Sequence, residues 1–347
     1  MEKKKRVTIY DIAKHLGVSG TTVSRALSDH HSIGDKTKKA VLQAAKEMGY
    51  IPNTIAAGLR KKQTNTIGVL IPWINRPFIS SMISGIEEVA NDAGYNVIIS
   101  QSCDSYKKEV ANAETFFSNR VDGVIASMAM ETEDFSHFNL FIDNDIALVF
   151  ADRVGKNLPQ DKVMIDNFAA AFEATEYLIH SGCRKIVHFT GAPNREIYKL
   201  RRAGYQDALE KNGIPYDEKL VFSGLLSGEE GVRNAKAILE LKELPDGIFS
   251  ANDTVAVHAM IELKKAGLKI PDDISFIGFN DDPIASIVEP QLTTVSHPAL
   301  EIGRSSARQI IKRINAKHSS PPENIVLPTQ IIVRESTRKL VKSVPPK

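Results

Sequence analysis

The sequence is poor in cysteine and contains no long hydrophobic run. Its 347 residues include two cysteines, Cys103 and Cys183, which lie far apart and outside any Cys-x-x-Cys spacing. A disulfide framework and a zinc site are therefore not expected. No apolar run reaches the roughly 18 residues of a membrane-spanning helix, and the basic start leads into Val7-Thr8-Ile9-Tyr10-Asp11 rather than a signal peptide. These absences predict a soluble cytoplasmic protein.

Signatures of the common enzyme classes are missing too. The chain has no Gly-x-Ser-x-Gly, Gly-x4-Gly-Lys-Ser/Thr, Gly-x-Gly-x-x-Gly or His-Glu-x-x-His motif. His180, Cys183 and His188 lie close in sequence, but His180 ends an expected helix and His188 falls within an expected strand. A structural role suits them better than a metal site, which needs convergent ligands. We expect no enzyme activity, no cofactor and no metal.

Positive charge is concentrated at the N-terminus, although the net charge of the chain is only +2. Residues 1–62 carry 13 Lys and Arg against 5 Asp and Glu, whereas the remaining residues carry 31 against 37. A patterned basic segment of this kind is typical of contact with a polyanion.

The length of the chain, 347 residues, favours more than one hydrophobic core and thus several domains.

Residues 8–27 have the pattern of two short helices around a tight turn. Thr8 and Asp11 have the spacing of a capping box, Gly17 ends the first helix, and Ser19 is placed to cap the second. A third helix is expected at about 35–48. This arrangement is typical of the helix-turn-helix DNA-binding motif, although a three-helix unit that binds protein has a similar pattern.

Exposed residues of the second helix are the candidates for reading base edges. Arg25 can donate two hydrogen bonds to a guanine, and Thr21 offers a hydroxyl and a methyl group. Ser19, Ser24 and Lys38 are candidates for phosphate contacts, which position the helix. The predicted DNA-binding residues are Thr8, Tyr10, Ser19, Gly20, Thr21, Thr22, Ser24, Arg25, Asn53, Ala56 and Leu59.

A further helix of about two turns is expected at 53–60, where Asn53 follows Pro52 and can act as the cap. So short a helix is marginal in water, and Gly58 in its interior weakens it further. It should therefore form only against a partner, and DNA is one such partner. Leu59 is then placed to enter the minor groove as an apolar wedge.

From Thr66 onward, short β-branched runs alternate with amphipathic helical stretches. Strands are expected at 67–71, 96–100, 123–127, 146–151, 185–190, 247–251 and 274–279, and helices at 80–93, 168–181, 202–212, 231–241 and 255–266. Such alternation is typical of parallel sheets with helices on both faces. Two sheets fit the length, with a ligand cleft between two lobes and passages between the lobes at 161–167 and 290–295.

Several segments, taken in order, resemble the lactose-repressor/galactose-repressor (LacI/GalR) family of transcriptional regulators. They are Val7-Thr8-Ile9-Tyr10-Asp11-Ile12-Ala13, Gly17-Val18-Ser19, Thr22-Val23-Ser24-Arg25, Gly49-Tyr50, Pro52-Asn53, Ala251-Asn252-Asp253, Ile277-Gly278-Phe279, Leu292-Thr293-Thr294-Val295 and the stretch from Leu327-Pro328-Thr329 through Val333-Arg334-Glu335-Ser336. The resemblance implies an all-α helix-turn-helix headpiece and an α/β two-lobed domain like that of periplasmic binding proteins, with doubly wound parallel sheets and three crossovers.

Domain boundaries follow from the same resemblance. Residues 1–62 correspond to the headpiece with its hinge helix, and residues 63–340 to an effector-binding and dimerisation domain. Lobe 1 is expected at about 63–164 and 294–322, and lobe 2 at about 165–291 and 323–340.

Effector-facing positions are also implied by the resemblance: Phe78, Asp152, Arg153, Arg201, Asn252 and Asn280. Trp73 is a further candidate because it follows a strand end. Its side chain could stack on a sugar or pack between the lobes, and the sequence favours neither role. The positive charges of Arg76 and Arg153 would suit an acidic effector at the mouth of the cleft. The alternative is that both side chains belong to a solvated surface and bind no ligand.

The sequence and the resemblance together predict a repressor under allosteric control by a small molecule, such as a sugar or sugar acid. The resemblance implies that it binds a pseudo-palindromic operator as a homodimer. Whether the effector induces or co-represses is left open, as is a tetramer. A solute-binding receptor and a doubly wound enzyme are the alternatives. The basic headpiece disfavours the first, and the missing catalytic motifs disfavour the second.

Replacing Leu59 by Ala tests the minor-groove wedge. We expect specific operator affinity to fall by roughly tenfold or more, while affinity for random DNA changes little, because only specific binding requires the kinked base step. Binding titrations on operator and random duplexes measure both quantities. An equal loss on the two duplexes would contradict the wedge.

Overall fold

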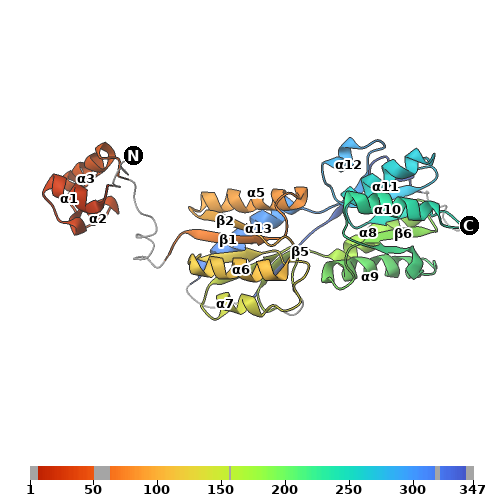
Figure 1. The fold of residues 1–347 in the computed structure, drawn as a ribbon, viewed down its shortest axis with the longest axis horizontal. Coiled ribbons are helices and arrows are strands. Elements are labelled where there is room, and N and C mark those ends of the chain that lie inside the picture. The colour runs from red at the N-terminus through yellow and green to blue at the C-terminus, as the bar shows by residue number, and fades with distance from the viewer. Residues whose placement is uncertain (1–6, 51–62, 156–157, 317–320, 341–347) are drawn as a thin grey trace, which may run out of the picture. The chain divides into compact units, whose positions relative to one another are not determined.

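The computed structural model describes residues 7–50, 63–155, 158–316 and 321–340 (Figure 1). The chain divides into two compact units, Met1–Thr64 and Asn65–Lys347. Three predicted DNA-binding residues, Asn53, Ala56 and Leu59, lie outside the described residues. Within those described, no helix has both the length and the apolar character needed to cross a membrane.

Three helices make up the described part of the first unit: α1 (Ile9–Leu16), α2 (Gly20–Leu27) and α3 (Asp35–Glu47). One apolar side chain from each helix, Ile12, Val23 and Val41, is fully buried between them. Packing of the three helices against one another therefore stabilises elements that are short for isolated helices.

Helix ends in this unit are capped as the sequence predicts. The Thr8 hydroxyl accepts a hydrogen bond from the amide of Asp11, and the Asp11 carboxylate accepts one from the amide of Thr8 at 2.8 Å. Gly17 ends α1 with a φ of 65°, in the left-handed region. Ser19 caps α2 by accepting from the amide of Thr22 at 3.1 Å. These contacts fix the turn between α1 and α2.

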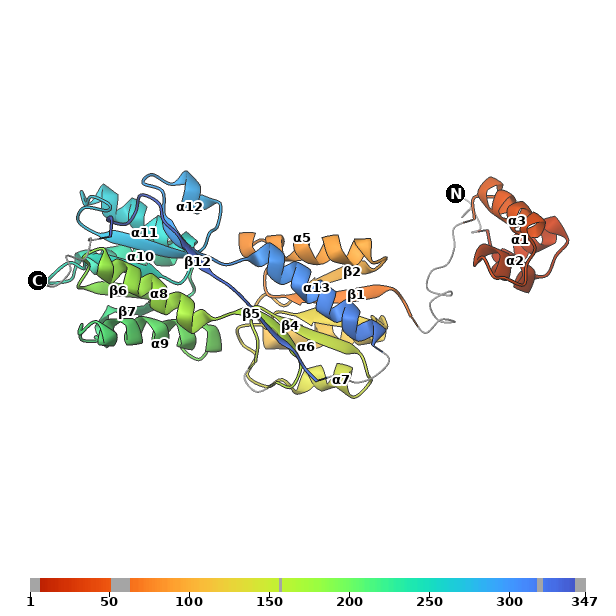
Figure 2. The same ribbon diagram turned by 180° about the vertical axis from the view of Figure 1, so that it is seen from behind.

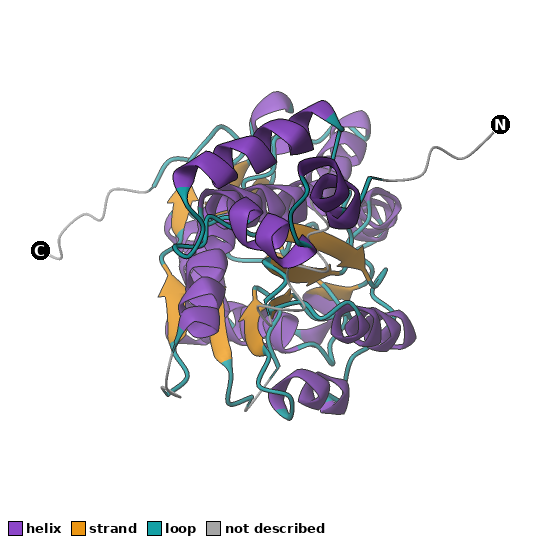
Figure 3. Ribbon diagram, turned by 90° about the vertical axis from the view of Figure 1, so that its left-hand side faces the viewer, coloured by secondary structure: helices purple, strands orange, loops and turns teal. Residues whose placement is uncertain are grey.

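The second unit contains two six-stranded sheets, one in each lobe, with helices packed around them (Figures 1 and 3). The first sheet has the order β11-β5-β4-β3-β1-β2. Its strands are β1 (Thr66–Ile71), β2 (Asn96–Gln101), β3 (Gly123–Ala126), β4 (Ala147–Ala151), β5 (Asp161–Ile165) and β11 (Asn324–Leu327). Its helices are α5 (Pro77–Asp92), α6 (Tyr106–Ser118), η1 (Ser136–Phe138), α7 (Asn139–Ile142) and α13 (Ala299–Asn315).

In the second sheet the order is β12-β10-β9-β8-β6-β7, and β12 alone among these strands runs antiparallel to its neighbour. The strands are β6 (Ile186–Thr190), β7 (Val221–Ser223), β8 (Gly247–Ser250), β9 (Ser275–Asn280), β10 (Thr293–Ser296) and β12 (Gln330–Ile332). The helices are α8 (Asn167–His180), α9 (Glu196–Lys211), η2 (Glu218–Leu220), α10 (Gly228–Leu239), α11 (Asp253–Lys265) and α12 (Ile284–Ile287).

All seven predicted strands are present, with each end within one residue of its predicted position. The apolar runs of the central strands β1 and β9 are buried on both faces, as is usual for central parallel strands. Strand β2, at the edge of its sheet, is largely exposed. Helix α9 begins six residues earlier than predicted, at Glu196 rather than Arg202. The inward-facing positions of its first turns include the polar residues Tyr198 and Arg201, which are buried. Because these residues are not apolar, the sequence pattern did not reveal the first turns of the helix.

Three passages connect the lobes, and two of them differ from the predicted positions (Figure 2). The first follows β5, within the predicted range. The second lies after β10, which pairs with β9 and so belongs to lobe 2 rather than to the lobe 1 segment predicted from residue 294. The third lies after β11, which pairs with β5, so residues 324–327 belong to lobe 1. Backbone pairing, which the sequence pattern does not encode, decides both assignments.

Helices α5 and α13 cross at unusually close range because each has a glycine at the contact. A Cβ on Gly303 would lie 2.0 Å from the carbonyl oxygen of Met82, and one on Gly85 would lie 2.1 Å from that of Leu300. Backbone atoms occupy the space of both missing side chains. Helix α13, in the C-terminal region of the chain, is thereby held against α5, the first helix of lobe 1.

Replacing Gly303 by Ala should force these helices apart. We expect a loss of about 2–3 kcal/mol, which lowers the melting temperature of a domain this size by roughly 4–10 °C. Differential scanning calorimetry measures the shift, with Arg308→Ala on an exposed position of α13 as the control. A melting temperature equal to that of the control would show that the contact between α5 and α13 can accommodate a methyl group.

Candidate functional site

The first unit exposes a set of polar side chains around α2. Tyr10, Thr21 and Arg25 are exposed, while Val23 on the opposite face of α2 is buried. Thr22 is less free than predicted, because its hydroxyl hydrogen-bonds to that of Ser19 at 2.9 Å. The exposed face of α2 is therefore available to a groove of DNA, as the sequence predicts, but contact with DNA remains a prediction.

Two headpiece residues have local partners that the sequence analysis did not foresee. Lys38, a candidate phosphate contact, forms an ion pair with Asp29 at 2.6 Å, and this hydrogen bond and charge lower the pKa of Asp29. Gly20 lies beneath the ring of Tyr10, since a Cβ there would be 3.1 Å from Tyr10 Cε1. A larger residue at Gly20 would therefore displace the exposed Tyr10 ring slightly.

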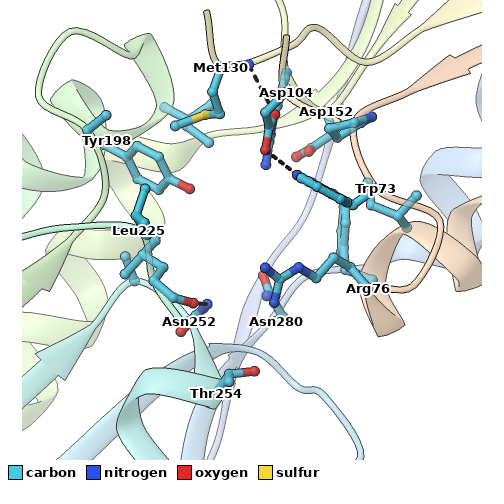
Figure 4. A pocket seen from close by; sticks show the side chains of 18 of the residues that line it. Trp73, Arg76, Asp104, Met130, Asp152, Tyr198, Leu225, Asn252, Thr254 and Asn280 are labelled. Atoms are coloured by element: carbon cyan, nitrogen blue, oxygen red, sulfur yellow. Dashed lines mark hydrogen bonds and ion pairs between the residues drawn. The ribbon is translucent and has the colours of Figure 1, made fainter. Parts of the chain in front are cut away.

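In the second unit, a cavity of about 360 Å³ lies between the lobes at the carboxyl ends of strands from both sheets (Figure 4). Tyr198 and Leu225 of lobe 2 face Trp73 and Asp152 of lobe 1 across it. The structure brings together all seven predicted effector-facing residues around this cavity: Trp73, Phe78, Asp152, Arg153, Arg201, Asn252 and Asn280.

Asp104 organises the lobe 1 wall, although no sequence argument identified it. Its carboxylate accepts hydrogen bonds from Arg153 Nη1 at 2.6 Å, Trp73 Nε1 at 2.7 Å and the amide of Met130 at 3.0 Å. The Trp73 indole is therefore held in place by a polar contact as well as by packing. The charge of Arg153 is largely matched by Asp104, which leaves it less available to an acidic ligand.

Arg201 carries a buried charge at the floor of the cavity. Its Nε donates to Asn167 Oδ1 and its Nη1 to the carbonyl oxygen of Ala251, each at 2.8 Å. Its guanidinium carbon lies 3.5 Å from the centroid of the Phe279 ring. Burial lowers the pKa of Arg201 to about 10, so the group stays charged at neutral pH.

Two acidic groups at the cavity have raised pKa values because they are buried. Burial raises the pKa of Asp152, and the charges of Arg153 and Arg201 partly offset the rise. Burial, with the charge of Asp281, raises the pKa of Asp282 to about 6. Perturbed carboxyl groups that line a cleft are a common property of binding sites.

Asn252 has a structural role as well as a place at the cavity. Its side chain caps α11 by accepting from the amide of Val255 at 2.9 Å, and it donates to the carbonyl oxygen of Leu226 at 2.9 Å. The amide is thus fixed, with little freedom to turn toward a ligand.

Sequence reasoning missed six polar lining residues: Asp104, Glu131, Tyr198, Thr254, Asp282 and His297. Three of them follow the ends of strands β2, β9 and β10, so the strand-end rule for ligand sites in parallel sheets could have found them. Tyr198 lies on a helix and offered no such signal.

A second cavity, also of about 360 Å³, adjoins the first and shares Met130, Arg153 and Ile197 with it. The lobes touch beside it. Asn194 donates to Glu133 at 3.1 Å, and Arg195 donates to the carbonyl oxygen of Thr132 at 2.9 Å. These contacts join the loops that follow β3 and β6 across the cleft.

Within the described ranges, no three His, Cys, Asp or Glu side chains are grouped as metal ligands would be. His188 and Cys183 are buried, and His188 Nδ1 lies 3.0 Å from the carbonyl oxygen of Phe249. Burial lowers the pKa of His188 to about 3, so this imidazole is neutral. Both residues have the structural surroundings that the sequence analysis expected.

Known families match both units. Residues 8–53 match the family described as bacterial regulatory proteins, lacI family, and residues 175–337 match the periplasmic binding protein-like domain. The HTH-type transcriptional regulator DegA of Bacillus subtilis (strain 168) is 34% identical over 336 residues, which cover 96% of this chain and 99% of DegA.

Two solved regulators have the same fold over nearly the whole chain. The lac repressor dimer bound to operator and the anti-inducer ONPF is 26% identical with a TM-score of 0.86, covering 96% of this chain and 100% of that one. The transcriptional regulator CelR in its cellobiose complex is 28% identical with a TM-score of 0.72, covering 95% and 100%. These relatives are regulators rather than enzymes. The chain belongs to the lacI family of bacterial DNA-binding transcriptional regulators.

Proposed function

We propose that this regulator is a cytoplasmic homodimeric repressor whose operator affinity is controlled by a sugar or sugar derivative bound between the two lobes. The observation that carries the proposal is the cavity at the strand ends, where all seven predicted effector-facing residues meet. Its mixture of aromatic rings, buried charges and fixed amides has the composition of a small-molecule site.

The charges of the cavity favour a neutral ligand over an acid. Its lining contains three arginines, Arg76, Arg153 and Arg201, and four acidic residues, Asp104, Glu131, Asp152 and Asp282. The pairing of Arg153 with Asp104 at 2.6 Å removes one cation from those that could bind a carboxylate. We therefore favour a neutral polyhydroxylated effector, and a sugar acid becomes the second choice.

Operator binding is assigned to the first unit. Arg25 and Thr21 on α2 are exposed, and residues 1–62 carry the chain's excess of positive charge. Both features suit a helix that reads the major groove from a position fixed by phosphate contacts. The described headpiece residues include none from the predicted hinge, so its role stays a prediction from the sequence.

Control of DNA binding would pass through the connections between the lobes. A ligand that contacts both walls stabilises one relative position of the lobes, and it can alter DNA affinity only if that position changes the dimer. Strand β2 lies at the edge of its sheet and exposes Ile98 and Ile99, which suits pairing with a second copy. Whether the ligand releases or strengthens operator binding depends on which position the DNA-bound dimer requires.

Selection of bound sequences from random duplex DNA tests the first half of the proposal. We expect a pseudo-palindrome whose affinity falls steeply with salt. Arg25→Ala should weaken binding by about 1–3 kcal/mol and relax specificity at one base pair, whereas Lys46→Ala on α3 should not change specificity. Failure to enrich any sequence would favour a solute-binding role.

Replacing Arg201 by Lys tests the second half, since it keeps the charge but removes the planar donor group. We expect the effector concentration for half-maximal change in operator affinity to rise at least about tenfold, with effector-free operator binding nearly unchanged. Fluorescence anisotropy with a labelled operator measures both. Arg202→Lys, at the neighbouring position outside this cavity, is the control, and an unchanged response in Arg201→Lys would remove Arg201 from the site.

A further inference from the structure

His297 lies on the second passage between the lobes, directly after β10 and before α13, and its side chain lines the cavity. Only 5% of the residue is exposed. Its ring packs against Phe78 of lobe 1, with 4.1 Å between centroids, and edge-on against Phe279 of lobe 2, with 5.7 Å. The imidazole is therefore held rigidly by aromatic rings from both lobes.

Each ring nitrogen of His297 faces an oxygen from a different lobe. Nδ1 lies 3.4 Å from Oδ1 of Asn280, at the end of β9, and Nε2 lies 3.4 Å from Oδ1 of Asp152, after β4. Among the described residues, Nε2 has no hydrogen-bond partner. A buried nitrogen without a partner is uncommon, because its desolvation is then uncompensated.

The orientation of the Asn280 amide decides which ring nitrogen of His297 carries the hydrogen. The amide oxygen makes the contact with Nδ1, at 3.4 Å, and an amide oxygen can only accept a hydrogen bond. This oxygen needs a donor, which places the imidazole hydrogen on Nδ1.

The protonation state of the ring completes the argument. Burial, together with the charge of Arg201, holds the pKa of His297 well below its usual value, so the imidazole is neutral and carries one hydrogen. With that hydrogen on Nδ1, Nε2 presents a lone pair to Asp152. Burial raises the pKa of Asp152, and the charges of Arg153 and Arg201 oppose that rise. As a premise of the proposal, we take Asp152 as a carboxylate at neutral pH. Two acceptors thus face each other at the cavity wall.

We propose that His297 Nε2 and Asp152 Oδ1 form a paired acceptor that binds a hydroxyl or amino hydrogen of the effector, and that His297 is a specificity-determining residue of the cleft. The inference rests on the proposed function, because it assigns a role within the same effector site. A donor placed here satisfies both atoms, whereas a carboxylate or phosphate oxygen would add a third acceptor. The pair therefore selects for a neutral polyol or an amine at this point.

The paired acceptor also links ligand binding to the lobes. Asp152 belongs to lobe 1, whereas His297 contacts Asn280 and the Phe279 ring of lobe 2. A hydrogen bound between them is held by both lobes at once. Without it, the two lone pairs repel each other, so the occupied cleft is more stable at this contact than the empty one.

A ligand-free experiment tests whether the paired acceptor exists. Asp152→Asn places an amide donor opposite Nε2, so we expect it to raise the melting temperature by several degrees more in the wild-type background than in the His297→Phe background. Phe keeps the ring packing but has no lone pair. Equal shifts in both backgrounds would mean that Asp152→Asn acts only by removing a buried charge, and would overturn the pair.

Nitrogen-15 NMR of histidine-labelled protein gives an independent check, with the His297→Phe variant identifying the signal among the nine histidines. We expect a neutral ring with its hydrogen on Nδ1. A hydrogen on Nε2 would overturn the proposal, because that nitrogen would then donate to Asp152.

Ligand selectivity is tested by calorimetric titration with D-ribose, D-glucose, cellobiose and the corresponding aldonic acids. We expect a neutral sugar to bind and His297→Phe to weaken it at least about tenfold, with the exposed His180→Phe as the matched control. Tighter binding of an aldonic acid, unaffected by His297→Phe, would overturn the assigned selectivity. If no compound binds, the sugar effector of the proposed function fails, while the stability and NMR results still decide whether the acceptor pair exists.

Discussion

The buried guanidinium of Arg201 is the charge around which the floor of the cleft is organised. Asn167 of α8, the end of β8 and the Phe279 ring of β9 all contact it, so one cation joins three elements of lobe 2. It also acts across the cleft, since its charge lowers the pKa of His297 and offsets the effect of burial on Asp152. The protonation states of the site therefore depend on a residue whose own hydrogen bonds are made within the protein.

Local patterns in the sequence predict the secondary structure, whereas the family resemblance implies most of the candidate site. The capping box of α1, the cap of α2 and the seven strands follow from residue types at short spacing, and they are present. The strand end located Trp73, and the resemblance implied the other six lining residues. The caps and strands could be predicted because neighbours within a few residues determine them.

Contacts between distant segments could not be predicted in the same way. Asp104 binds Trp73 and Arg153 from two other strand ends, and His297 lies between residues of both lobes. Likewise, nothing in the sequence of β10 or β11 shows which sheet each strand joins, so two of the three passages between lobes were misplaced. Pairing partners in space, rather than propensity, decide these features.

The path of the chain also sets the order in which the parts can be completed during synthesis. Lobe 2 is nearly continuous from α8 to β10, whereas the first sheet lacks α13 and β11 until the chain has been made beyond Leu327. Synthesis of lobe 1 therefore begins before that of lobe 2 but is completed only after most of lobe 2 has been made. During this interval, the apolar residues of lobe 1 that later pack against α13 are exposed. A chain that ends before Ala299 would carry the segments of the headpiece and most of lobe 2, joined by a lobe that cannot close its core.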